Sequence, residues 1–122
     1  MDDKYYKLQD IVIDTFDLDA PIEIEEGVLL LDKTSKNVFL KLKLNVLDVD
    51  ISRVSSVSLR IDCLDDAMEI ITEISPYIFT YRDIFLIDSK TFGEDNPILL
   101  DDRVRRINVG ISKVVFTDTS TW

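Results

Sequence analysis

Apolar and polar residues alternate along much of this chain, and the alternation is cleanest over residues 37–46. There the order N-V-F-L-K-L-K-L-N-V places valine and leucine side chains on one face and Lys41, Lys43 and Asn45 on the other. A two-residue period of this kind is typical of a β-strand with one buried and one solvent-facing side. The pattern therefore predicts a strand that packs directly on the core.

A second alternating strand is predicted over residues 57–63, where V-S-L-R-I-D-C again separates apolar from polar positions. Antiparallel neighbours place apolar side chains opposite apolar ones and polar side chains opposite polar ones. We therefore expect the two strands to pair with Leu44 opposite Leu59. The same register sets Lys41 opposite Asp62.

Shorter apolar segments between turn signals predict further strands at residues 10–16, 22–25, 28–31, 70–81, 98–100 and 104–116. Gly27 predicts a bulge or a turn between the second and third of these segments. Pro76 lies inside the fourth segment and, because it has no N–H, places that segment at a sheet edge or at a bulge. The apolar phase of the last segment slips near Ser112, which predicts a β-bulge there.

Strands of this number and length indicate an all-β protein, an antiparallel β-sandwich of about seven to nine strands. The length of 122 residues suits one domain with a single core. We expect residues 1–19 to form an N-terminal segment that is partly ordered or adds an edge strand. Residues 20–122 are expected to form the sandwich.

Charge and hydropathy narrow the classes of partner. The formal net charge of −10 disfavours nucleic acid and anionic membrane surfaces and favours a cationic partner. No apolar run approaches the roughly 20 residues that span a bilayer. The amino terminus M-D-D-K-Y-Y-K lacks the apolar region of a secretory signal. We therefore expect no membrane insertion and a cytoplasmic location.

The sequence contains no histidine and a single cysteine, Cys63. Without histidine, the chain has no histidine-dependent catalytic triad, no histidine zinc ligand and no imidazole acid-base chemistry. Cys63 falls on the inward face of its strand, so we expect a small buried hydrophobe, with a reactive thiol as the alternative. No cofactor is predicted.

Paired aspartates near the predicted strand ends suggest a calcium site as one interpretation, because Ca²⁺ takes about six to eight oxygen ligands from such loops. If strand directions alternate along the chain, one end of the sandwich brings together Asp48, Asp50, Asp101 and Asp102. Asp65 and Asp66 are then expected at the other end. The alternative is that all of these aspartates only shape solvated turns.

Arg103, Arg105 and Arg106 form the one dense basic cluster of the sequence and suit a carboxylate or phosphate ligand. Asp101 and Asp102 come directly before them. A local, solvated ion-pair network is therefore the alternative interpretation of the three arginines.

Tyr77, Phe79 and Tyr81 fall on one face of a predicted strand, with Phe85 and Trp122 as candidate neighbours. Such an aromatic row suits the core, a protein interface or a carbohydrate-stacking surface. If the row points outward from an edge strand, we expect a two-fold homodimer that buries Tyr77 and Tyr81.

Two segments resemble known sequences. V-S-S-V-S-L-R-I-D-C-L-D-D, residues 54–66, is similar to the central strand of small bacterial immunoglobulin-like sandwich domains of the FxLYD type. Residues 92–122 look like the carboxy-terminal part of uncharacterised sandwich domains of low-GC Gram-positive bacteria. The resemblance implies an immunoglobulin-like sandwich and no activity. The sequence departs from the resemblance at Met68, where those domains carry a glycine. A methionine at positive φ costs about 1 kcal/mol or more, so Met68 argues against the same turn type in this chain.

The favoured function is a non-catalytic interaction or structural module with a protein partner. The alternative is a carbohydrate-binding module that uses the aromatic row, together with a structural calcium ion. An enzyme is disfavoured, because glycoside hydrolysis by two carboxylates needs a cleft that a small sandwich hardly offers.

Overall fold

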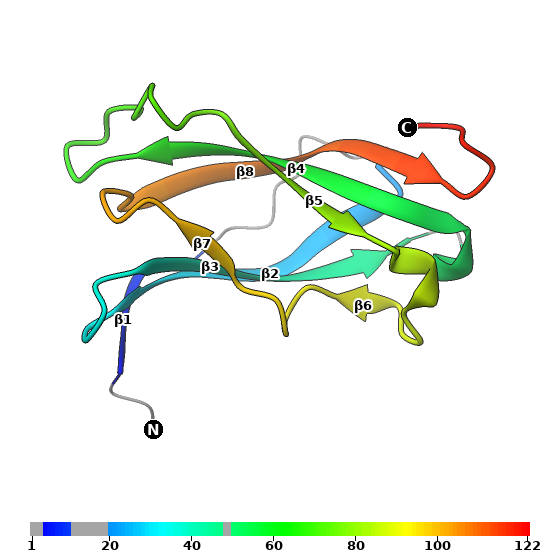
Figure 1. Cartoon of the computed structure of the whole chain (residues 1–122), viewed down its shortest axis with the longest axis horizontal. Coiled ribbons are helices and arrows are strands. Elements are labelled where there is room, and N and C mark those ends of the chain that lie inside the picture. Colours follow the sequence, from blue (N-terminus) through cyan, green and yellow to red (C-terminus); the bar gives the residue numbers. More distant parts are fainter. Residues whose placement is uncertain (1–3, 11–19, 48–49) are drawn as a thin grey trace.

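The described part of the chain is an antiparallel β-sandwich of eight strands, which confirms the predicted all-β fold and agrees with the predicted number of strands (Figure 1). The computed structural model describes residues 4–10, 20–47 and 50–122. The strands are β1 (Tyr5–Asp10), β2 (Ile22–Asp32), β3 (Val38–Val46), β4 (Val54–Leu64), β5 (Tyr77–Arg82), β6 (Thr91–Phe92), β7 (Ile98–Leu100) and β8 (Arg106–Phe116). Two short 3-10 helices, η1 (Ile51–Arg53) and η2 (Ile84–Leu86), lie in the connections.

The strands form two sheets that face each other as two layers in Figure 1. The larger sheet has the order β1-β2-β3, and both β6 and β7 pair with β3. The smaller sheet has the order β5-β4-β8, so β4 is its central strand. The chain crosses from the larger sheet to the smaller one after β3, returns after β5 and crosses again after β7.

The core lies between the sheets and is built mainly from the inward faces of β3 and β4. All ten of these side chains are at most 4% exposed: Val38, Leu40, Leu42, Leu44, Val46, Val54, Val57, Leu59, Ile61 and Cys63. Each fully buried aliphatic side chain contributes about 1.5–3 kcal/mol relative to exposure. The buried faces predicted from the two-residue period are therefore confirmed for both strands.

The predicted pairing of these two strands is wrong, because β3 and β4 belong to different sheets. Leu44 lies opposite Ile24 of β2, whereas Leu59 pairs with residues of β5 and β8. Lys41 and Asp62 are likewise on separate sheets and form no pair. The apolar face of a strand is buried by packing against the opposite sheet, and this burial does not require that the contacting strands be neighbours in one sheet. The alternation therefore determined which face is buried but not which strands are hydrogen-bonded.

A β-bulge at Glu25 turns two predicted strands into one. Ile24 pairs with Leu44 and Glu26 with Lys43, so Glu25 is the extra residue. The insertion shifts the phase by one position, and the even-numbered isoleucines before it and Leu29 after it all face the core. The bulge predicted at Gly27 therefore lies two residues earlier, at Glu25, and β2 continues as one strand to Asp32.

The bulge predicted near Ser112 is confirmed. Ser58 pairs with Lys113 and Leu59 pairs with Ile111, which leaves Ser112 without a partner in the ladder. The Ser112 hydroxyl donates to the Ser58 carbonyl oxygen at 3.1 Å. The slip of apolar phase in the sequence was therefore a reliable signal for the bulge.

The strand predicted over residues 70–81 begins later than expected. Residues 65–76 form a loop in which Ile70 makes only an isolated bridge to Leu64, and β5 starts at Tyr77, directly after Pro76. Proline ends the loop and so never has to donate within the ladder. Of the two placements that Pro76 predicted, a sheet edge or a bulge, the sheet edge is the one observed for β5.

One edge of the larger sheet is formed by β1, which pairs with the second half of β2. The segment predicted as an edge strand, residues 10–16, lies outside the described residues except for Asp10. The side-chain amide of Gln9 reaches from β1 to the edge of the smaller sheet: Nε2 donates to the Ile107 carbonyl at 3.3 Å, and Oε1 accepts from the Ile107 N–H at 2.9 Å. This amide takes the place of a neighbouring strand beside β8 and links the two sheets.

Met68 adopts a left-handed conformation, with φ of 65°. The Asp65 carboxylate accepts from the N–H groups of Ala67 and Glu69 and holds the turn in this form. The departure noted in the sequence therefore leaves the turn in place at a cost in backbone strain.

Replacing Met68 with glycine should raise the free energy of unfolding by about 1 kcal/mol, because glycine adopts positive φ without a Cβ penalty. The measurement is urea denaturation followed by circular dichroism. Met68→Ala is the matched control, since it retains Cβ and should give little gain. Equal stabilisation by both substitutions would show that the side chain, and not the backbone, is the source of the strain.

Replacing Gln9 with alanine should lower the free energy of unfolding by about 1–3 kcal/mol, because two hydrogen bonds to the β8 edge are lost. Tyr6→Ala on the same strand is the control, since Tyr6 is exposed. The same urea titration applies. A Gln9→Ala protein as stable as wild type would mean that the amide contact does not hold the sheets together.

Candidate functional site

The aspartates proposed as calcium ligands do not converge. Asp50 precedes β4 and accepts hydrogen bonds from the N–H and hydroxyl of Ser52 at 3.0 and 2.9 Å. Asp101 and Asp102 lie in the turn before β8, whose Arg105 N–H donates to Leu64 at the opposite end of β4. The placement of the set at one end was wrong because β6 and β7 both run antiparallel to β3, so two consecutive strands share one direction.

Within the described residues no group of three or more acidic or cysteine side chains is placed to hold a metal ion. Asp48 lies outside that part of the chain. Asp65 and Asp66, expected at the far end, lie in the loop after β4 and so at the same end as Asp101. The turn-shaping role is seen for Asp50, Asp65 and Asp101, each of which accepts from backbone N–H groups of its own turn.

The arginine cluster is engaged locally. Arg103 donates to both carboxylate oxygens of Asp101, at 2.9 and 3.2 Å, and to Glu73 at 2.9 Å. These hydrogen bonds lower the pKa of Asp101 to about 2 and raise the pKa of Arg103. Arg105 donates to two carbonyl groups of its own loop, and Arg106 is exposed at the start of β8. The local ion-pair interpretation is thus confirmed for Arg103.

The aromatic row runs from the surface into the core. Tyr77 is 38% exposed, Phe79 is half-buried and Tyr81 is only 7% exposed. Tyr81 packs edge-to-face on Phe79, with centroids 5.0 Å apart, and on Phe92 of β6, at 5.4 Å. Burial raises the pKa of the Tyr81 hydroxyl to about 12. The core interpretation therefore holds for Tyr81, and the row does not present three rings to a ligand.

The expected partners of the row are placed elsewhere. Phe85 lies on η2 and Trp122 packs on the core beside β8, and among the described residues neither makes a ring contact with the row. The predicted burial of Tyr81 in a homodimer interface is wrong, because Tyr81 is already buried within the chain. A homodimer through other residues stays a prediction.

Cys63 is a buried free thiol at 1% exposure, and burial raises its pKa. Reactive cysteines have lowered pKa values and partial exposure, so the environment of Cys63 is the reverse of theirs. The Ser75 hydroxyl bonds to both backbone groups of Cys63. The side chain therefore packs as the small hydrophobe that was expected.

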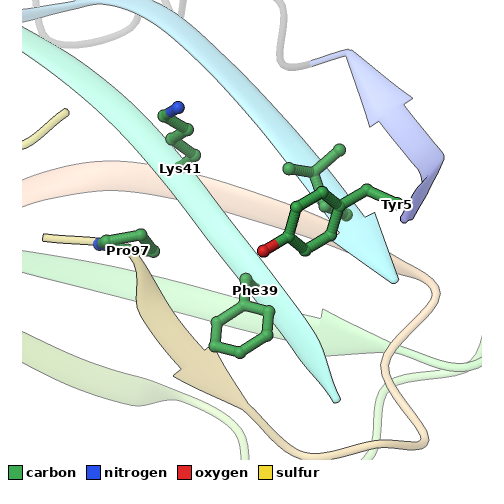
Figure 2. Close-up of a pocket in the computed structure, with 5 residues that line it drawn as sticks. Tyr5, Phe39, Lys41 and Pro97 are labelled. Carbon is green, nitrogen blue, oxygen red and sulfur yellow. The ribbon is translucent and has the colours of Figure 1, made fainter. Parts of the chain in front are cut away.

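A feature that the sequence analysis did not single out is an apolar hollow on the outer face of the larger sheet, with a volume of about 130 Å³. It is lined by Tyr5 of β1, Leu30 of β2, Phe39 and Lys41 of β3, and Pro97 before β7. Figure 2 shows Tyr5 reaching from β1 towards β3, with its hydroxyl on the side of Phe39 and with Pro97 on the far side of β3. Side chains from three strands and one loop thus line one hollow.

An open groove of about 700 Å³ continues from the hollow, and the two share Leu30 and Lys41. The charged residues along this groove are Lys7, Asp10, Glu25, Glu26, Lys41, Lys43 and Glu94. The site therefore has an apolar end and a charged end on a single sheet face.

Most of the charges in the groove are paired. Lys43 Nζ lies 3.9 Å from Glu25 and 3.7 Å from Glu94, and Lys7 lies 3.2 Å from Asp10. The bulge at Glu25 is the cause of this crowding, because it brings two consecutive glutamates beside Lys43. One ammonium group is consequently shared between two carboxylates.

Gly93 allows the loop after β6 to pass close to β3. Its φ is +100°, and a Cβ at this position would lie 2.9 Å from both the Leu42 carbonyl oxygen and the Leu44 side chain. The same loop carries Glu94 to the groove and Pro97 to the hollow. The close approach that only glycine permits therefore positions one wall of the site.

The signal for the hollow was present in the sequence. Residues 28–31 are all apolar, so in a sheet with one core face Val28 and Leu30 must point to the outside. Phe39 is the one large apolar residue on the polar face of its strand. What the sequence could not supply is the arrival of Tyr5 and Pro97 from distant segments.

The chain matches no protein-family model, no curated protein and no solved structure. In the ranges that the structure covers, no helix has the length and hydropathy to cross a bilayer. The function has therefore to be inferred from the geometry of the molecule itself.

Replacing Gly93 with alanine should lower the free energy of unfolding by about 2 kcal/mol or more, because the new Cβ meets backbone and the left-handed φ is strained. Gly110→Ala in β8 is the control, since Gly110 has no positive φ. Thermal and urea denaturation give the values. A loss no larger than that of the control would show that the loop does not depend on the close approach.

Proposed function

We propose that the protein is a non-catalytic interaction module that binds a protein partner through the outer face of its larger sheet. The observation that supports this proposal is the apolar hollow formed by Tyr5, Leu30, Phe39 and Pro97. The inner face of the same sheet is already buried, so its outer face is expected to be polar in a domain that has no partner there. Exposed apolar surface rimmed by polar residues is typical of interaction sites.

The size of the hollow favours a protein partner over a small ligand. Pockets for small molecules and cofactors measure about 300–1,000 Å³ and are mostly apolar, whereas the hollow measures about 130 Å³ and the adjoining groove of about 700 Å³ is open and lined by seven charged residues. It suits one apolar side chain of a longer segment, and the groove beside it suits the rest of that segment. A carbohydrate-binding role draws less support, because Tyr81 is buried and unavailable for stacking.

Two further points belong to the same proposal. We propose that the chain is an immunoglobulin-like sandwich domain of the FxLYD-like kind found in low-GC Gram-positive bacteria. Residues 54–66 resemble the FxLYD type, and residues 92–122 resemble uncharacterised sandwich domains of those bacteria. A cytoplasmic location fits the single cysteine, which is buried as a free thiol, because reducing compartments keep thiols unpaired. No catalytic role is proposed for any residue.

The proposal is tested by selecting binders to the folded protein from a random-peptide display library and measuring them on two variants. Phe39→Ser removes the floor of the hollow and should weaken selected peptides by about tenfold or more, as expected for loss of an anchor contact. Leu86→Ser is the control, because Leu86 is exposed on η2, outside the hollow and the groove. Its affinity should equal that of wild type.

Tyr5→Ser provides a second, independent change in the same hollow and should also weaken binding. Circular dichroism and thermal unfolding establish that each variant is folded. The proposal fails if the library yields no binder to wild type, or if the binders are insensitive to both substitutions in the hollow.

A further inference from the structure

Two charged side chains beside the hollow lack an ion pair in the described part of the chain: Lys41 and Glu26. Lys41 is exposed and lines both the hollow and the groove. Glu26 is exposed in β2 and lines the groove but not the hollow. The two lie at different distances from the apolar end, so their order along the sheet determines what kind of segment can bind.

The pairing of β2 with β3 gives that order. Successive outward-facing pairs along the two strands are Leu30 with Phe39, Val28 with Lys41, and Glu26 with Lys43. Each step covers two residues, or about 6.6 Å, so the last pair lies about 13 Å from the first. The site thus presents an apolar pair, then a lysine, then a group of acids.

The far end of the groove is negative. The carboxylates of Glu25, Glu26 and Glu94 line this end. In the part of the chain that the structure describes, the one cation paired with any of them is Lys43, which lies near Glu25 and Glu94. The formal net charge of −10 adds a long-range attraction for cations. Both the local and the overall charge therefore favour a positively charged group at this end.

We propose that the occupant is a basic linear segment of a partner protein, with one apolar side chain in the hollow and an arginine or lysine at the Glu26 end. An extended chain advances about 3.3–3.6 Å per residue, so the two side chains are about four residues apart. Lys41 lies between them and repels a basic residue placed next to the apolar anchor. This inference rests on the proposed function and specifies the chemistry of its partner.

Three blocked synthetic peptides test the inference, each symmetric so that the direction of binding does not matter. The first is Arg-Arg-Ser-Ser-Ser-Leu-Ser-Ser-Ser-Arg-Arg, the second carries glutamate in place of arginine, and the third moves the arginines beside the leucine. NMR titration of the wild-type protein gives each dissociation constant. The first peptide should bind about tenfold more tightly than the second and about threefold more tightly than the third.

Charge reversal in the groove should act in opposite directions on the first peptide. Glu26→Lys should weaken it about threefold to tenfold, and Lys41→Glu should strengthen it by a similar factor. Asp66→Lys is the matched control, because Asp66 is exposed in the loop after β4 and the change in net charge is the same as in Glu26→Lys. Its effect should be much smaller and should vanish at high salt.

The outcomes separate the inference from the function on which it rests. Equal or tighter binding of the glutamate peptide, or equal weakening by Asp66→Lys and Glu26→Lys, overturns the inference. If the library then still yields peptides that require Phe39, the interaction function stands with a partner of different charge. Absence of binding by all three synthetic peptides also overturns the inference, and the function falls with it only if no Phe39-dependent peptide is selected.

Discussion

The burial of two alternating faces against each other is the constraint on which this sandwich depends. The inward side chains of β3 and β4 are almost wholly removed from water, and each strand is held in place by neighbours within its own sheet. Bulges at Glu25 and Ser112 keep the apolar phase aligned with this core where the sequence slips by one position. The irregularities of the ladder therefore serve the core, and the outward residues are placed as a consequence.

The sequence predicted those parts of the fold that depend on local periodicity. The buried faces of β3 and β4, the short strand at residues 98–100 and the bulge at Ser112 all follow from the spacing of apolar residues along one segment. The predicted pairing of Leu44 with Leu59 was wrong, because the two strands lie in different sheets and bury their apolar faces against each other across the sandwich. Neighbour relations depend on chain crossings between sheets, which a two-residue period does not encode.

The candidate site was predicted least well, for a related reason. The acidic and basic clusters that stood out in the sequence are close in the chain, and such residues mostly bond within their own turns, as Asp101 and Arg103 do. The hollow instead combines side chains from β1, β2, β3 and the loop before β7. A site assembled from segments so far apart in sequence becomes visible only when the strand order is known.

The contact of Gln9 with β8 has a consequence for the solution behaviour of the protein. The same short strand supplies Tyr5 to the hollow and Gln9 to the edge of the smaller sheet, so detachment of β1 would remove a wall of the site and uncover a strand edge together. Open strand edges are templates for intermolecular pairing and aggregation. A partner that binds Tyr5 while β1 is attached would stabilise the attached form by mass action. Such a partner would therefore keep the edge of β8 covered and protect the protein from aggregation.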